Sequence, residues 1–134
     1  MADRIGEGLS IPDLEIQNLN HLSEIIYGLT GGQCTLEVVG GAKNKKWPRK
    51  DVDVTIEFPE GRGSSELGRA QDRLNSLVEM VESIEKASNG YFKKDKVVDP
   101  FVDAEFGGDD ILAHSGSILL KPKKGTVIEL VPIS

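Results

Sequence analysis

Residues 51–58 read DVDVTIEF, the clearest alternation of polar and apolar side chains in the chain. This two-residue period is typical of a strand with one buried face. A turn-forming stretch, PEGRG, follows at 59–63, and after it comes SELGRAQDRLNSLVEMVESIEKAS at 65–88. Apolar residues recur there at steps of three and four from Leu67 to Ile84, which predicts a long amphipathic helix. A strand that leads into a helix of this kind indicates an α+β domain with the helix packed on a sheet.

The predicted helix is long for the size of the chain. At 1.5 Å per residue it would extend about 36 Å, whereas a compact chain of this length has a radius of gyration near 14 Å. Its apolar stripe fits packing on a sheet, and it also fits pairing of two helices. We therefore expect the 65–88 helix to span the domain or to project from it, and a homodimer through this helix is one possible arrangement.

The remaining elements are shorter. Asn18 is the expected N-cap of a short helix that Gly31-Gly32 ends, and the alternation of Leu14 and Ile16 predicts a short strand before it. The other predicted strands are 34–39, 91–98, 101–106, 111–121 and 126–133, of which the last two form a C-terminal β-hairpin around PKKG. The prediction is a flexible arm at 1–13 and one α+β domain at 14–134, with an antiparallel sheet, one long amphipathic helix and one short helix.

Composition limits the class of protein. The 134 residues carry 16 basic and 22 acidic side chains, a net charge of −6, and 38% of them are hydrophobic. The single cysteine, Cys34, excludes an intrachain disulfide and a cysteine-rich zinc site. No apolar run reaches the roughly 18 residues of a membrane span, and the first residues do not resemble a signal peptide. We expect a cytoplasmic protein that does not bind membranes.

Two blocks of opposite charge are candidate binding surfaces. Residues 43–50 (KNKKWPRK) carry five positive charges and a tryptophan, and residues 99–110 (DPFVDAEFGGDD) carry five negative charges. The acidic net charge disfavours a nucleic-acid partner, and the acidic block lacks the regular ligand spacing of a calcium loop. We therefore predict a small non-enzymatic protein that binds a protein partner. The predicted binding residues are Lys43, Lys45, Lys46, Trp47, Arg49, Lys50, Asp103, Glu105, Asp109 and Asp110.

A second interpretation starts from Gly40-Gly41 and the Asp51-x-Asp53 pair that follows it. Two carboxylates two residues apart on a strand project from the same face and can share a divalent cation. The order strand, Gly-Gly, Asp-x-Asp strand, helix resembles the minimal nucleotidyltransferases of the polymerase-β type. That resemblance implies Mg²⁺ bound by Asp51 and Asp53 and a nucleoside triphosphate held at Gly40 and Gly41. It also implies a third carboxylate, at Asp99 or Asp103.

The same residues are also compatible with a plain β-hairpin. Residues 42–50 offer few apolar positions for the helix that a nucleotidyltransferase has there, and Pro48 would fall in its last turn. In a hairpin of strands 34–39 and 51–58, Asp51 and Asp53 are the solvent face of an amphipathic strand, with no metal or cofactor. A further alternative is an acidic decoy that occupies the groove of a nucleic-acid-binding protein.

Overall fold

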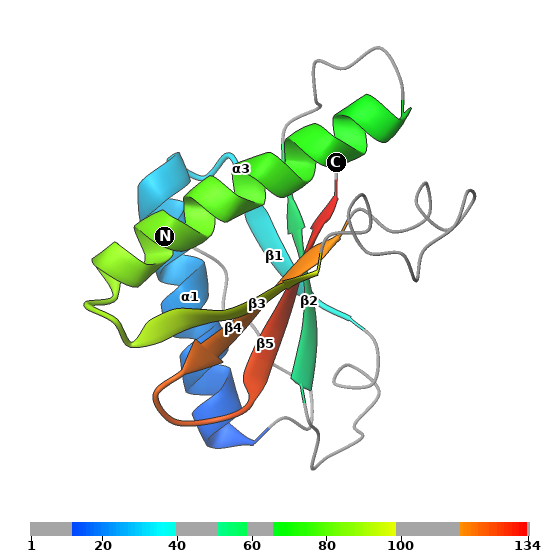
Figure 1. Cartoon of the computed structure of the whole chain (residues 1–134). Helices are drawn as coiled ribbons and strands as arrows, with labels where there is room; N and C mark the ends of the chain where they lie inside the picture. Colours follow the sequence, from blue (N-terminus) through cyan, green and yellow to red (C-terminus); the bar gives the residue numbers. More distant parts are fainter. Residues whose placement is uncertain (1–11, 40–50, 59–65, 99–115, 134) are drawn as a thin grey trace.

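Two helices and a five-stranded sheet form the described part of the chain in this computed structural model (Figure 1). The structure describes residues 12–39, 51–58, 66–98 and 116–133. The elements in chain order are α1 (Asp13–Thr30), β1 (Thr35–Val38), β2 (Asp51–Glu57), α3 (Glu66–Ala87), β3 (Phe92–Val98), β4 (Ser117–Pro122) and β5 (Val127–Ile133). An α+β fold is thus confirmed.

The sheet has the strand order β1-β2-β5-β4-β3, and it is mixed. β1 pairs with β2, β3 with β4 and β4 with β5, all antiparallel, but β2 and β5 are parallel from Asp51↔Val127 to Glu57↔Ile133. The prediction of a wholly antiparallel sheet is therefore wrong at one seam. The C-terminal hairpin of β4 and β5 is present. Its last strand, β5, runs parallel to β2. A parallel pair needs a long connection, and α3, β3 and β4 provide it here.

The first helix begins earlier than the sequence pattern indicated. α1 starts at Asp13 and includes Leu14 and Ile16, so the predicted short strand is wrong, as is Asn18 as N-cap. Pro12 precedes the helix with φ −55°, and its carbonyl accepts the first helical hydrogen bond, from the Ile16 N–H at 3.0 Å. Proline supplies a preset φ at this position without losing a needed donor. Gly31 ends the helix with φ 64°, as predicted.

The core lies between the two helices and one face of the sheet. α1 contributes Leu19, Leu22 and Ile26, and α3 contributes Leu77, Val81 and Ile84. They pack on side chains that alternate along the strands: Val52, Val54, Ile56, Ile118, Leu120, Ile128 and Leu130, all of them fully buried. Burial of this apolar surface is the main source of stability for the fold. Both helices therefore cover one face, and the other face of the sheet carries no described helix.

The predicted helix at 65–88 is confirmed as α3, with bounds one residue shorter at each end. Its apolar stripe between residues 74 and 84 is buried within this chain. The outward positions of the same stretch, such as Asn75, Glu79 and Glu82, are polar and exposed. Over residues 71–87, the helix stripe is therefore used for intramolecular packing and gives no argument for a homodimer.

Candidate functional site

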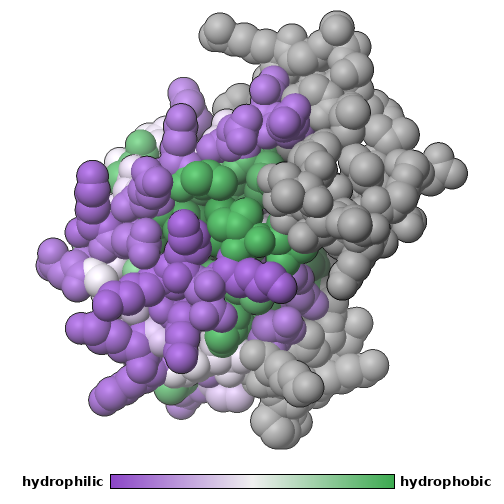
Figure 2. Space-filling view, in the orientation of Figure 1, coloured by the Kyte–Doolittle hydropathy of each residue, from purple (hydrophilic) through white to green (hydrophobic). Residues whose placement is uncertain are grey.

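The side of the sheet opposite the helices carries most of the polar side chains of β2, β4 and β5, and we call it the open face. Val52, Val54 and Ile56 point into the core, so Asp51, Asp53 and Thr55 point to the open face. By the same alternation, β5 presents Val127, Glu129 and Val131, and β4 presents Ser117, Leu119 and Lys121. Figure 2 shows hydrophobic side chains gathered in the middle of the molecule with hydrophilic side chains around them.

Three carboxylates meet on the open face at β2 and β5. Asp53 and Glu129 are partners in the parallel register, so their carboxyl groups lie side by side on the open face. Ser117, only 6% exposed, donates a hydrogen bond from its hydroxyl to Glu129 Oε2 at 3.2 Å. Asp51 lies two residues before Asp53 on the same face. The expected shared face of Asp51 and Asp53 is thus present, and Glu129 joins them from a strand about 75 residues away in the chain.

This environment changes the acidity of Glu129. Burial raises the pKa of the Glu129 carboxyl, and the hydrogen bond with Asp53 and the negative charges of Asp53 and Asp51 raise the pKa further. The Ser117 hydroxyl acts in the opposite direction, because a donor to the carboxylate favours its ionised form. The net effect is a pKa above the ordinary value for a glutamic acid.

The geometry does not complete a metal centre within the described residues. No group of three or more histidine, cysteine, aspartate or glutamate side chains there is arranged so that it could hold a metal ion. The predicted third carboxylate, Asp99 or Asp103, and the predicted phosphate-binding Gly40 and Gly41 lie outside the described residues. β1 and β2 pair directly in antiparallel register from Thr35↔Glu57 to Val38↔Val54, as the hairpin interpretation requires.

The predicted charged blocks are also outside the described part of the chain. This applies to Lys43, Lys45, Lys46, Trp47, Arg49 and Lys50, and to Asp103, Glu105, Asp109 and Asp110. Of the candidate site residues chosen from sequence, the structure therefore places only Asp51 and Asp53.

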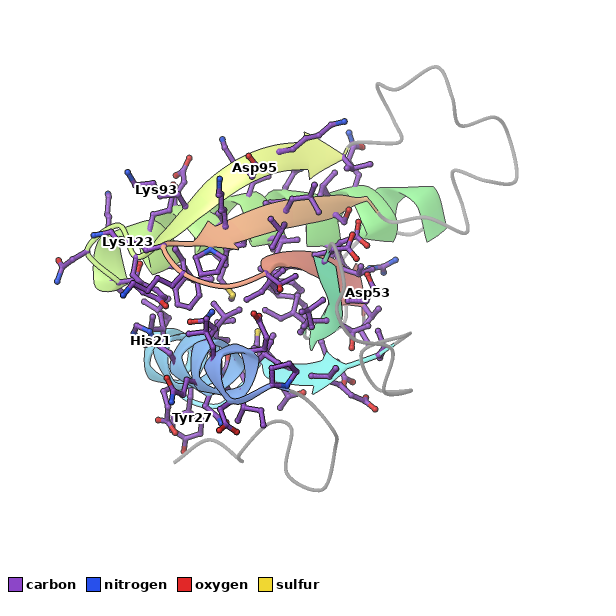
Figure 3. All side chains as sticks on the ribbon, turned by 90° about the horizontal axis from the view of Figure 1, so that it is seen from below. His21, Tyr27, Asp53, Lys93, Asp95 and Lys123 are labelled. Atoms are coloured by element: carbon purple, nitrogen blue, oxygen red, sulfur yellow. The ribbon has the colours of Figure 1, made fainter. Side chains whose placement is uncertain are left out.

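A basic surface that the sequence pattern did not single out lies at one end of the sheet. It consists of five exposed lysines that β3, β4 and the turn after β4 bring together, and we call it the lysine surface: Lys93, Lys96, Lys121, Lys123 and Lys124. Lys94 is also exposed, but it pairs with the core residue Leu120 and therefore lies on the helix side of the sheet. The five lysines are among the 16 basic residues of an acidic chain. Figure 3 shows Lys93 and Lys123 at the same end of the sheet, away from Asp53.

Strand pairing creates the lysine surface from two separate segments. Lys93 and Lys121 are direct partners in the antiparallel register of β3 and β4. Lys96 reaches the same face because a register shift between Lys94 and Lys96 inserts Asp95 as an extra residue. The two lysine clusters, at 93–96 and 121–124, are each unremarkable in sequence, and only their pairing makes one surface.

Buried hydrogen bonds hold the turn that carries Lys123 and Lys124. Asn18, 2% exposed, donates from Nδ2 to the Lys124 carbonyl at 2.7 Å, and its Oδ1 accepts from the Tyr91 hydroxyl at 2.6 Å. The Lys123 N–H donates to the Tyr91 carbonyl at 2.9 Å. The backbone of these two lysines is therefore fixed against α1 and the start of β3, while their side chains are exposed.

The outer edge of β3 is partly closed by α3. The Phe92 N–H donates to Ser88 Oγ at 3.2 Å, and the Lys94 N–H donates to Glu85 Oε2 at 3.2 Å. Side chains from the end of α3 thus accept hydrogen bonds from two backbone N–H groups that an added strand would need. The register shift between Lys94 and Lys96 comes directly after them in β3. Caps, bulges and lysines of this kind protect edge strands from pairing with other chains. The lysine surface therefore offers side chains rather than backbone to a partner.

No protein-family model, no curated protein and no solved structure matches this chain. Among the described helices, neither is both long and apolar enough to span a membrane.

Proposed function

We propose that this protein is a binding protein without catalytic activity, and that its lysine surface holds an acidic segment of a protein partner. The observation that supports this function is the grouping of five exposed lysines on β3, β4 and the following turn. Ammonium groups on neighbouring strands and the turn that joins the next strand produce a positive potential that attracts carboxylates, even on a chain with a net charge of −6.

The position of Lys93 directly opposite Lys121 on the neighbouring strand supports a binding role for this surface. Like charges directly opposite each other on neighbouring strands destabilise a sheet, by about 0.2–1 kcal/mol for a typical pair. Lys93 and Lys121 are such a pair, and both are exposed. An acidic side chain placed between the two ammonium groups would remove the repulsion and gain two charge-assisted hydrogen bonds.

An acidic protein fits this surface better than a nucleic acid. Non-specific binding of single strands uses exposed aromatic rings as stacking platforms. The aromatic rings beside the lysines are engaged elsewhere: Phe92 is fully buried, and the Tyr91 hydroxyl is bonded to Asn18.

The test is a binding titration with a defined acidic probe. Fluorescein-labelled poly-L-glutamate is titrated with the wild-type protein and with the triple variant Lys93→Gln/Lys96→Gln/Lys121→Gln, and anisotropy is recorded. We expect affinity to fall about 5- to 150-fold in the triple variant, from about 0.3–1 kcal/mol for each of its exposed charge contacts. Affinity should also fall with added salt, because exposed charge pairs are screened.

A matched control distinguishes the effect of losing the lysine surface from the effect of a more negative net charge. The variant Gln71→Glu/Asn75→Glu/Ser76→Glu changes the net charge by the same −3, at exposed positions of α3. It should bind the probe within a factor of about two of wild type. Equal loss in both triple variants would contradict a role for the lysine surface. Tighter lysine-dependent binding of an oligonucleotide or of phosphatidylserine vesicles would contradict the class of partner.

A further inference from the structure

The parallel seam between β2 and β5 joins two parts of the sheet. On one side is the hairpin of β1 and β2, and on the other is the antiparallel group β5, β4 and β3. All seven residues of β2 have partners on β5, from Asp51↔Val127 to Glu57↔Ile133. Within the described strands this seam is the only backbone pairing that connects the two parts. Anything that strengthens or weakens it changes the cohesion of the whole sheet.

Two acidic side chains face each other across the middle of this seam. Asp53 and Glu129 occupy the same register position on neighbouring strands, and both point to the open face. Two ionised carboxylates have only acceptors and repel each other, whereas a proton held on one oxygen would turn this repulsion into a hydrogen bond. We propose that Asp53 and Glu129 share one proton across the β2–β5 seam, and that this shared proton makes the seam a pH-sensitive joint of the sheet.

The neighbouring groups determine the direction of the response. On β2, Asp51 adds a further negative charge on the same face. On β4, the buried Ser117 donates to Glu129, and Lys121 lies on the same face two residues beyond Leu119, the partner of Glu129. On β1, Glu37 lies on this face beside Thr55. Both helices pack on the other face, so none of their described side chains places a charge at the pair.

Acid should therefore stabilise the seam. Burial, and then the interactions with Asp53, raise the pKa of Glu129 in the folded protein above its value in the unfolded chain. A group with a raised folded pKa contributes stability that is fully present below the unfolded pKa and is lost as pH rises through the folded pKa. For Glu129, the pH range over which this stability is lost begins near the ordinary pKa of a glutamic acid, about 4.3, and extends to higher pH.

The experiment compares thermal unfolding of wild type and Glu129→Gln from about pH 8 down to about pH 5. The glutamine amide donates to Asp53 at every pH, so the variant retains the hydrogen bond and loses the titration. We expect the Tm of the variant to exceed that of wild type at the highest pH, and we expect this difference in Tm to shrink as the pH falls. Glu57→Gln, an exposed position on β2, is the control and should follow the wild-type curve.

A second measurement does not depend on the stability of any variant. The side-chain carboxyl carbon of Glu129 is followed by NMR through an acid titration of the wild-type protein. A midpoint above the ordinary value of a glutamic acid, about 4.3, supports the shared proton. A midpoint at that ordinary value, or a Tm difference between wild type and Glu129→Gln that stays constant with pH, would overturn the proposal.

Discussion

The carboxylate of Glu15 in α1 accepts three hydrogen bonds from Thr126, a residue 111 positions away at the start of β5. The Thr126 N–H donates to Oε1 at 3.0 Å and to Oε2 at 3.1 Å, and the Thr126 hydroxyl donates to Oε1 at 3.0 Å. Glu15 is only 6% exposed. A buried acid in the first turn of a helix is favoured by the helix dipole, and here it also anchors the turn of the lysine surface.

Replacing Glu15 with alanine should destabilise the protein. The substitution leaves the partly buried N–H and hydroxyl of Thr126 without their acceptor, and an unsatisfied buried group costs about 1–3 kcal/mol. We expect a loss of that size in the free energy of unfolding measured with urea. Glu24→Ala, at an exposed position of the same helix, is the control and should change it by less than about 0.5 kcal/mol. A Glu15 variant as stable as the Glu24 variant would contradict the anchoring role.

Two glycine-to-alanine substitutions should act in opposite directions. Gly125 has φ +113°, and a methyl group there would collide with Asn18 Nδ2 and approach Glu15 Oε1 to 3.1 Å, so Gly125→Ala should lower Tm. Gly28 lies inside α1 with no atom within 4 Å of an added Cβ. Gly28→Ala should therefore raise stability by about 0.5–1 kcal/mol, because alanine is the better helix former. Differential scanning calorimetry of both variants checks this, and the same sign of shift in both would be inconsistent with it.

Lys121→Glu should separate stability from binding. It replaces the like-charged Lys93–Lys121 pair with an opposite-charged pair on neighbouring strands, which should stabilise the sheet by about 0.2–1 kcal/mol. The same change removes a cation from the lysine surface, so binding of poly-L-glutamate should weaken. Tm and anisotropy are measured on one preparation. A variant that loses both stability and binding would indicate a structural rather than a binding role for Lys121.

Cys34 should react slowly with thiol reagents in the folded protein. It is 7% exposed, and burial raises the pKa of its thiol. Because the thiolate is the reactive form, a raised pKa leaves less of it near neutral pH, and the rate should increase as pH rises toward that pKa. Labelling by iodoacetamide should be much faster in urea than in buffer. Equal rates in the two conditions would show that the thiol is accessible in the fold.

Much of the local structure could be predicted from the sequence, because it depends on short-range periodicity. The alternation in DVDVTIEF gave β2 with Asp51 and Asp53 on one face, and the three- and four-residue spacing gave α3. The prediction was less successful at the start of α1, where Leu14 and Ile16 were assigned to a strand. Both residues alternate in sequence, but Pro12 and the acids of the first turn begin a helix there.

The candidate sites required information that a local pattern does not contain. Glu129 was not selected from the sequence because its partner, Asp53, is distant in the chain and adjacent only through the parallel pairing of β2 and β5. That pairing could not be predicted, since the alternation of apolar and polar residues in a strand does not specify which strand it pairs with. In the same way, the lysines at 93–96 and 121–124 became one surface only through the register of β3 and β4.

The sequence by itself therefore determined most of the described elements, their buried faces and the α+β class of fold, since these follow from the order of apolar and polar residues along a few turns or strands. Tertiary structure decided which strands are neighbours, because strand order depends on how the helices and the sheet bury their apolar faces together. It consequently decided which charges meet. The Asp53–Glu129 pair and the lysine surface are both products of that strand order.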